Sequence, residues 1–186
     1  MMKYISIACF LLIIQLLTAC TDKPMYNVVS VEDGDTIILS INGKNERVQL
    51  KGIDAPEDTE NPKLKVDLKR TGLDKEQLLT IGKQATQYLQ SLIYLSKNQV
   101  SLWADLKQRD KYGRIPAVVF DKDGMPLNHK MIEEGYAIML KNPPLEENLS
   151  NALQINQKKA LLNRAGLWRS HRNTMIQWSG IKADQP

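Results

Sequence analysis

The stretch TIILSINGKNERVQLKG, residues 36–52, consists of two β-rich segments joined by an Asn-Gly pair. Its first segment, TIILSI, is rich in isoleucine, whose branched side chain packs well on a pleated surface. Asn42-Gly43 is a strong signal for a two-residue hairpin turn. After the turn, Val48 and Leu50 alternate with polar neighbours, as in a strand with one buried face. We therefore predict an antiparallel β-hairpin with one face on a core.

The rest of the chain continues this β-rich pattern and adds segments with helical spacing. The predicted strands are residues 26–32, 36–41, 46–52, 99–105 and 114–121. The predicted helices are residues 81–95, 127–135 and 146–164. Residues 58–79 are polar and lack both periods, so we interpret them as irregular. Strands with interspersed helices indicate an α+β chain, mainly a small β-barrel.

The N-terminal 19 residues predict a secretory signal peptide. Lys3 gives a basic start, and residues 4–19 are almost wholly apolar. Leu17-Thr18-Ala19-Cys20 resembles the lipobox of bacterial lipoproteins, in which the cysteine receives the lipid. A buried helix and a membrane span are the alternatives, but the run is shorter than the ~20 residues that a span needs.

We therefore expect Cys20 to be lipidated and residues 20–25 to form a tether. The protein would then lie in a bacterial cell envelope, anchored to a membrane on its extracytoplasmic side. Residues 26–168 would form one domain, followed by a C-terminal tail, residues 169–186. The formal net charge of +4 permits a polyanionic partner without demonstrating one.

Acidic residues gather in two short segments beside predicted strands. The segments are Asp33-Gly34-Asp35-Thr36 and Ile53-Asp54-Ala55-Pro56-Glu57. Carboxylates held next to Gly and Pro turns suit a hard cation and a general base. Asp-Gly is also a common turn pair, and the first segment alone favours a plain turn. The second acidic segment shifts the interpretation toward a metal site.

A third segment, Asp110-Lys111-Tyr112-Gly113-Arg114, adds a cationic donor. A guanidinium stays charged and donates two parallel hydrogen bonds to a phosphate. An exposed ion pair is the alternative role for this arginine. The chain has only two histidines, His129 and His171, and no cysteine pair outside its leader, so it lacks the ligands of a zinc or histidine-based nuclease. The three segments together indicate a metal-dependent phosphodiesterase.

Six motifs occur in the order and approximate spacing of the staphylococcal nuclease (thermonuclease-like) family, which the chain resembles over about residues 26–168. They are VEDGDT, VQLKGIDAPE, IGKQA, DKYGR, NHKMIEEGYA and NRAGLW. The resemblance implies an OB-fold, a five-stranded Greek-key barrel with about three packed helices. It also implies an enzyme that cleaves DNA and RNA, preferably single-stranded, and leaves 3′-phosphates; with the lipobox-like segment at Cys20, the chain would be a lipoprotein member of the family.

The family's chemistry maps onto individual positions of this chain. By resemblance, Asp35 and Asp54 would bind Ca²⁺, together with the backbone carbonyl of Ala55. Glu57 would be the general base that takes a proton from the attacking water, and Arg114 would hold the phosphate. Two residues of the same motif, Lys111 and Tyr112, could flank a bound nucleotide, and either could equally be an ordinary turn residue.

Gln49 departs from the pattern, because the family has a second phosphate-binding arginine there. Losing one donor aimed at transition-state charge typically costs ~10²–10³ in rate. Arg47 and Lys51 share the predicted strand face of Gln49, and either could compensate. Gln49 also supports a rival interpretation, a weak or inactive OB-fold module that binds nucleic acid.

The segment after Glu57 contains several basic residues, Lys63, Lys65, Lys69 and Arg70. It could be a basic flap over the site or a solvated loop. We favour the loop.

Overall fold

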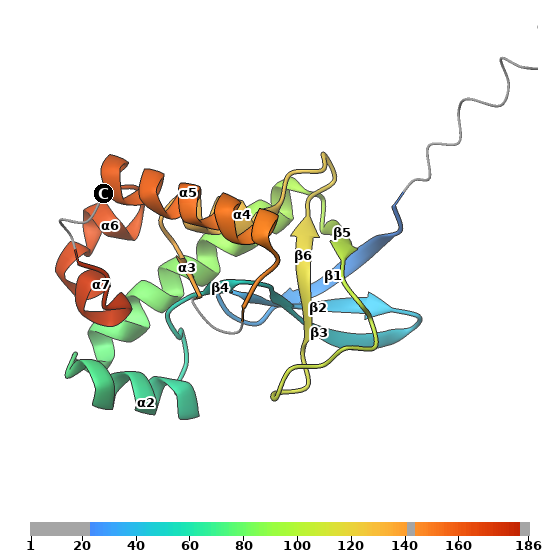
Figure 1. Ribbon diagram of the computed structural model, residues 1–186. Helices are drawn as coiled ribbons and strands as arrows, with labels where there is room; N and C mark the ends of the chain where they lie inside the picture. Colours follow the sequence, from blue (N-terminus) through green and yellow to red (C-terminus); the bar gives the residue numbers. More distant parts are fainter. Residues whose placement is uncertain (1–22, 141–143, 183–186) are drawn as a thin grey trace, which may run out of the picture.

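The computed structural model describes residues 23–140 and 144–182 (Figure 1). Its strands are β1 (Met25–Val31), β2 (Thr36–Ile41), β3 (Lys44–Leu50), β4 (Ile53–Asp54), β5 (Gln99–Trp103), β6 (Ile115–Phe120) and β7 (Ile138–Met139). Five of them close into a barrel in the order β1-β2-β3-β6-β5, and β4 pairs with β7 separately. Neighbours in the barrel are antiparallel except β3 and β6. The predicted α+β barrel is confirmed, and it agrees with an OB-fold.

The hairpin of β2 and β3 has the predicted turn. Asn42 and Gly43 have positive φ angles of 52° and 76°, as a type I′ turn requires at both central positions. The register pairs Ile37 with Val48, and both side chains are fully buried. The alternating pattern therefore identified the buried face correctly.

The described helices outnumber the three predicted ones. They are α2 (Pro62–Thr71), α3 (Lys75–Leu95), α4 (Leu127–Glu133), α5 (Glu147–Asn163), α6 (Leu167–Ser170) and α7 (Arg172–Ser179). The predicted helices correspond to α3, α4 and α5. Figure 1 shows α2, α6 and α7 together at the end of α3 that lies away from the barrel.

Two apolar clusters stabilise the domain, and α3 contributes to both. Its C-terminal half places Ala85 and Leu89 against the barrel core. Its N-terminal half places Leu78 and Ile81 in a second core built with α2, α5, α6 and α7. Helix α3 therefore packs against both cores. Because α2 packs in the second core, α3 fixes the position of α2 relative to the barrel.

The prediction that residues 58–79 are irregular is wrong. They contain α2 and the first turn of α3. Asn61 caps α2 by accepting a hydrogen bond from the Leu64 N–H over 2.8 Å, and Pro62 occupies the first turn. Asp74 starts α3 with a reciprocal capping box. Only Leu64 and Asp67 of α2 are buried, so its apolar stripe is too thin to give a helical period in the sequence.

Helices α6 and α7 occupy much of the range predicted as a C-terminal tail. Helix α7 buries Met175 and Trp178 in the second core. The Trp178 indole N–H donates to Asp67 of α2 over 3.2 Å, and Arg70 donates to the Trp178 carbonyl over 2.7 Å. Helix α7 therefore holds α2 in place.

The predicted signal peptide and Cys20 lie outside the described residues. Within residues 23–140 and 144–182, no helix is both long enough and apolar enough to cross a membrane.

Candidate active site

The two acidic segments meet at Asp35 and Ala55. The Ala55 N–H donates a hydrogen bond to Asp35 Oδ2 over 3.2 Å. The Leu50 N–H donates to the Asp35 carbonyl over 2.8 Å. Asp35 itself is 5% exposed. Its carboxylate therefore links the loop before β2 to the segment after β4.

Asp35 lies in a strongly acidic environment. Asp33 Oδ1 accepts the Asp35 N–H over 2.9 Å, and the Thr36 hydroxyl donates to Asp35 Oδ1 over 2.9 Å. Burial, then the charge of Asp33, raise the pKa of Asp35 to about 7, although Lys63 and Arg114 oppose the shift. A further cation near Asp35 would stabilise the charged form of its carboxyl group.

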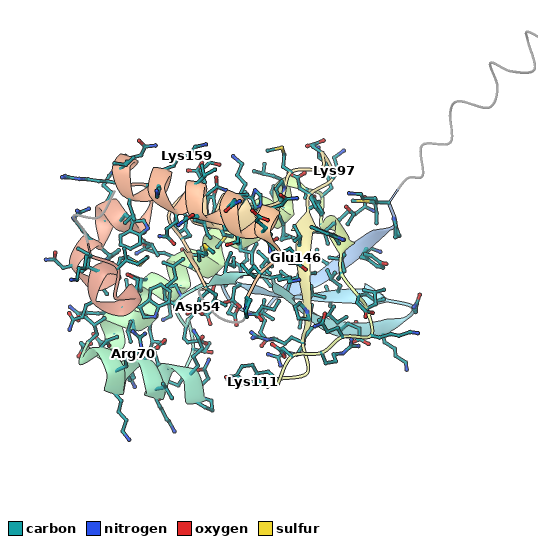
Figure 2. The ribbon with its side chains drawn as sticks, in the orientation of Figure 1. Asp54, Arg70, Lys97, Lys111, Glu146 and Lys159 are labelled. Carbon is teal, nitrogen blue, oxygen red and sulfur yellow. The ribbon has the colours of Figure 1, made fainter. Side chains whose placement is uncertain are left out.

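Asp54 lies on β4, opposite Ile138 of β7. Its Oδ1 is 3.0 Å from the Lys63 ammonium nitrogen. Burial raises the pKa of Asp54 to about 6, against the effect of Lys63. Figure 2 labels Asp54 between the barrel and the helix α2 that carries Arg70. This second aspartate therefore faces the helix that the sequence did not predict.

Glu57 is buried, and both of its carboxylate oxygens have partners. Oε1 accepts from the Lys63 ammonium over 2.5 Å, and Oε2 accepts from the Asn61 side-chain amide. The side chain of Glu57 is 9% exposed. Its carboxylate is therefore held in one orientation by two residues at the start of α2.

The backbone of Glu57 lies directly on α3. A Cβ added to Gly82 would be 2.0 Å from the Glu57 carbonyl oxygen, far inside van der Waals contact. The Thr86 hydroxyl donates to Asp58 Oδ2 over 2.8 Å. Gly82 thus allows a close approach that places Glu57 beside the two aspartates.

Lys63 is the residue whose predicted environment was most wrong. Instead of lying in a solvated loop, its Nζ also approaches the Ala55 carbonyl at 3.3 Å and Asp67 Oδ2 at 3.8 Å. Burial opposes the charge of Lys63, but Asp54 and Glu57 outweigh it and raise its pKa. The lysine is therefore a charged ammonium inside the acidic cluster. This environment agrees better with a basic flap over the site, the alternative interpretation, than with a solvated loop.

Arg114 is held beside Asp35. Its Nε donates to Asp110 Oδ2 over 2.9 Å, its Nη1 donates to the Thr36 hydroxyl over 3.1 Å, and Nη1 is 3.7 Å from Asp35 Oδ1. Partial burial opposes the charge of Asp110, but hydrogen bonds from Arg114 hold the pKa of Asp110 below its usual value. Asp110 therefore positions the guanidinium.

Tyr112 and Lys111 lie next to this arginine at the surface. The Tyr112 side chain is 55% exposed, and the Arg114 guanidinium carbon is 5.1 Å from its ring centroid. The Lys111 ammonium is 4.9 Å from the same centroid. An exposed ring flanked by two cations can meet a base and its phosphate together.

Gln49 pairs with Thr36 across β2 and β3, so both side chains project from the same face. That face leads to Arg114 through the Thr36 hydroxyl. The two cations that could compensate for Gln49 have other partners. Arg47 pairs with Glu32, and Lys51 is 2.7 Å from Glu146.

The described residues contain no group of three or more His, Cys, Asp or Glu side chains that converges as a ready metal cage. The donors around Lys63 are nevertheless hard oxygens: the Asp54 carboxylate and the Ala55 carbonyl, with Asp35 adjacent. Ca²⁺ accepts such ligands in irregular geometry. These oxygens are therefore of the kind that binds Ca²⁺, and the Lys63 ammonium contacts two of them, from Asp54 and Ala55.

The sequence reasoning missed three contributors to the site: Asn61, Asp67 and Gly82. One signal for them was available. Asn61-Pro62 combines a favoured helix cap with a favoured first helical residue, and so predicts a helix start just after Glu57. The contacts of this helix with Glu57 could not be predicted from the local sequence.

Comparisons with known proteins agree with this geometry. The family model described as "Staphylococcal nuclease homologue" matches residues 47–170. This range includes Gln49, Asp54, Glu57 and Arg114, whereas Asp35 precedes it.

Several known proteins are similar to this chain over most of their own length. A thermonuclease of Staphylococcus intermedius is 34% identical over 143 residues, 77% of this chain and 75% of the relative. An uncharacterized endonuclease of Escherichia coli is 33% identical over 90% of each chain. A thermonuclease of Staphylococcus hyicus is 30% identical over 79% of this chain and 77% of the relative. The chain therefore belongs to the staphylococcal nuclease family.

Proposed function

We propose that the protein is a calcium-dependent endonuclease that hydrolyses phosphodiester bonds of DNA and RNA. The observation that carries the proposal is the meeting of Asp35, Asp54, Glu57 and Arg114 at one place on the barrel, linked by hydrogen bonds and ion pairs. The thermonuclease and endonuclease relatives support the same activity.

Glu57 is the group that would take the proton of the attacking water. Asn61 holds one oxygen of its carboxylate, which orients the other. A base must be within hydrogen-bond reach of its water before its basicity matters. Arg114 would bind the phosphate. Its bonds to Asp110 and Thr36 use two of the five guanidinium N–H donors and leave others for substrate oxygens.

Asp35, Asp54 and the Ala55 carbonyl would hold Ca²⁺. A bound calcium ion would supply positive charge to the phosphoryl oxygens as negative charge develops on them. The pKa values of Asp35 and Asp54, raised mainly by burial, support this assignment, because a bound cation would stabilise the charged forms of both carboxyl groups.

Single-stranded nucleic acid is the substrate that the surface next to the site suits best. Tyr112 offers an exposed ring for stacking on an unpaired base, and Lys111 adds a phosphate contact. Stacking of this kind tolerates many sequences. The products would carry 3′-phosphates, as the family resemblance implies.

The second candidate function is a nucleic-acid-binding module that cleaves slowly or not at all. Gln49 favours it, because a neutral amide brings no positive charge to the phosphate on the face shared with Thr36. Lys51 pairs with Glu146 and Arg47 pairs with Glu32, although Arg47 also donates to the Tyr112 carbonyl over 3.3 Å and so lies beside the segment that carries Arg114.

An assay on denatured DNA separates the two functions. We expect the native chain to cleave with Ca²⁺ and to stop with a chelator, and we expect Gln49→Arg to cleave at least about tenfold faster because it restores a transition-state donor. Asn45→Arg, exposed on the same strand, adds the same charge elsewhere and should leave the rate unchanged. Binding without cleavage by both the native chain and Gln49→Arg would establish the module instead.

We also propose that Cys20 anchors the protein to a membrane on its extracytoplasmic side. The lipobox-like sequence before it supports the proposal. In cell fractionation, the native chain should sediment with membranes and Cys20→Ser should be found in the soluble fraction. Retention of Cys20→Ser in the membrane fraction would argue against a lipid anchor.

A further inference from the structure

Lys63 brings a positive charge to the oxygens that the proposed function assigns to the cation and the base. Its Nζ is 2.5 Å from Glu57 Oε1 and 3.0 Å from Asp54 Oδ1. It is also 3.3 Å from the Ala55 carbonyl oxygen. These three oxygens come from one short segment, and a single ammonium contacts all of them.

The cluster needs positive charge in the absence of a metal ion. Four acidic side chains interact electrically there, Asp33, Asp35, Asp54 and Glu57, and the two cations that oppose them at Asp35 are Lys63 and Arg114. Arg114 is already engaged with Asp110 and Thr36. Lys63 is therefore the cation in contact with both Asp54 and Glu57.

The position of Lys63 is built into the fold. It lies in the first turn of α2, next to the capping residue Asn61 that binds the other oxygen of Glu57. Further along α2, Asp67 accepts hydrogen bonds from Arg70 and from the Trp178 indole of α7. These contacts fix the helix, so the ammonium is directed at the acids by buried packing rather than by a mobile loop.

We propose that Lys63 is an internal competitor of the divalent cation, which must displace its ammonium from Asp54, the Ala55 carbonyl and Glu57 before the site is complete. The proposal rests on the proposed function. It makes Lys63 the residue that sets how much Ca²⁺ the protein requires. It also gives the cation a second effect, because displacement of the ammonium frees Oε1 of Glu57.

The displaced lysine has a place to go. Asp67 lies one turn further along α2, with its Oδ2 3.8 Å from the Lys63 Nζ. A lysine side chain has a flexible four-carbon stem, so its ammonium can move to Asp67 while α2 stays in place. Exchange of a single charge for a doubly charged ion at the same oxygens favours the metal once its concentration suffices.

Calcium binding measured by calorimetry tests the proposal independently of activity. Lys63→Met keeps the length of the side chain and removes its charge, and we expect its Kd for Ca²⁺ to be at least about tenfold lower than that of the native chain. Lys65→Met is the matched control, since Lys65 is an exposed residue two positions along the same helix. Its Kd should equal the native value.

Amine labelling followed by mass spectrometry tests the same exchange in the native chain, so a poorly folded variant does not decide the result. Without Ca²⁺, Lys63 should label slowly because its nitrogen is held by carboxylates. Saturating Ca²⁺ should raise the labelling rate of Lys63, because its ammonium then exchanges three oxygen contacts for one carboxylate, Asp67, which Arg70 and Trp178 already engage. Lys65 should label at the same rate in both conditions.

The outcomes distinguish this inference from the proposed function. If the native chain binds Ca²⁺ and cleaves, but Lys63→Met binds no tighter and Lys63 labelling ignores Ca²⁺, the competitor role is wrong and the nuclease assignment stands. If neither the native chain nor Lys63→Met binds millimolar Ca²⁺, both the competitor role and the calcium dependence are wrong.

Discussion

Glu57→Gln should lower calcium-dependent cleavage of denatured DNA by ~10²–10⁴, the usual contribution of a general base. Glutamine keeps the size of the side chain and its bond with Asn61, but its amide cannot take a proton from water. The substitution also removes the acid that pairs with Lys63, so the comparison must be made at saturating Ca²⁺. The measurement is the initial cleavage rate, with binding of the same DNA measured in parallel.

Glu60→Gln is the control for this substitution. Glu60 lies three residues further along the chain, and its carboxylate is exposed and paired with Lys75. Its loss should leave cleavage unchanged. A Glu57→Gln variant that cleaves at the native rate would remove Glu57 from the mechanism, whatever its effect on calcium binding.

Gly82→Ala should reduce cleavage by at least about 10² and destabilise the fold by ~1–3 kcal/mol, the usual cost of overpacking. The new Cβ would be 2.0 Å from the Glu57 carbonyl oxygen and 2.7 Å from the Asp58 backbone nitrogen. Both atoms belong to the backbone, so the segment that carries Glu57 must move. A displacement of about 1 Å is enough to misplace a catalytic group.

The sign of the stability change makes this prediction specific. In an unconstrained helix, Ala is more favourable than Gly by ~1 kcal/mol, so propensity alone would stabilise Gly82→Ala. Chemical denaturation should show the opposite. Lys83→Ala, at the exposed neighbouring position of α3, controls for helix propensity and should retain both stability and activity. If Gly82→Ala kept the native stability and cleavage rate, the backbone at Glu57 would have moved away from the new Cβ without affecting the site, and the prediction would be wrong.

The sequence alone determined the barrel and the acidic segments, because both depend on local patterns. Asn42-Gly43 specifies the hairpin turn through its positive φ angles, and the alternation around Val48 specifies the buried face. Asp35 directly precedes β2 of this hairpin, whereas Asp54 ends β4, a two-residue strand that the sequence did not predict. The family resemblance then assigned their roles, and the structure brings the two segments together through Ala55.

Tertiary structure decided which side chains surround those acids. Lys63 reads as an ordinary basic residue in a polar segment, and its partners Asp54 and Glu57 are reached only because α2 folds back over them. The position of α2 depends in turn on Trp178, 111 residues along the chain from Asp67. Contacts over such separations leave no periodic pattern in the sequence, because periodicity reports only on residues within the same helix or strand. The two partners come into contact only when the second core forms.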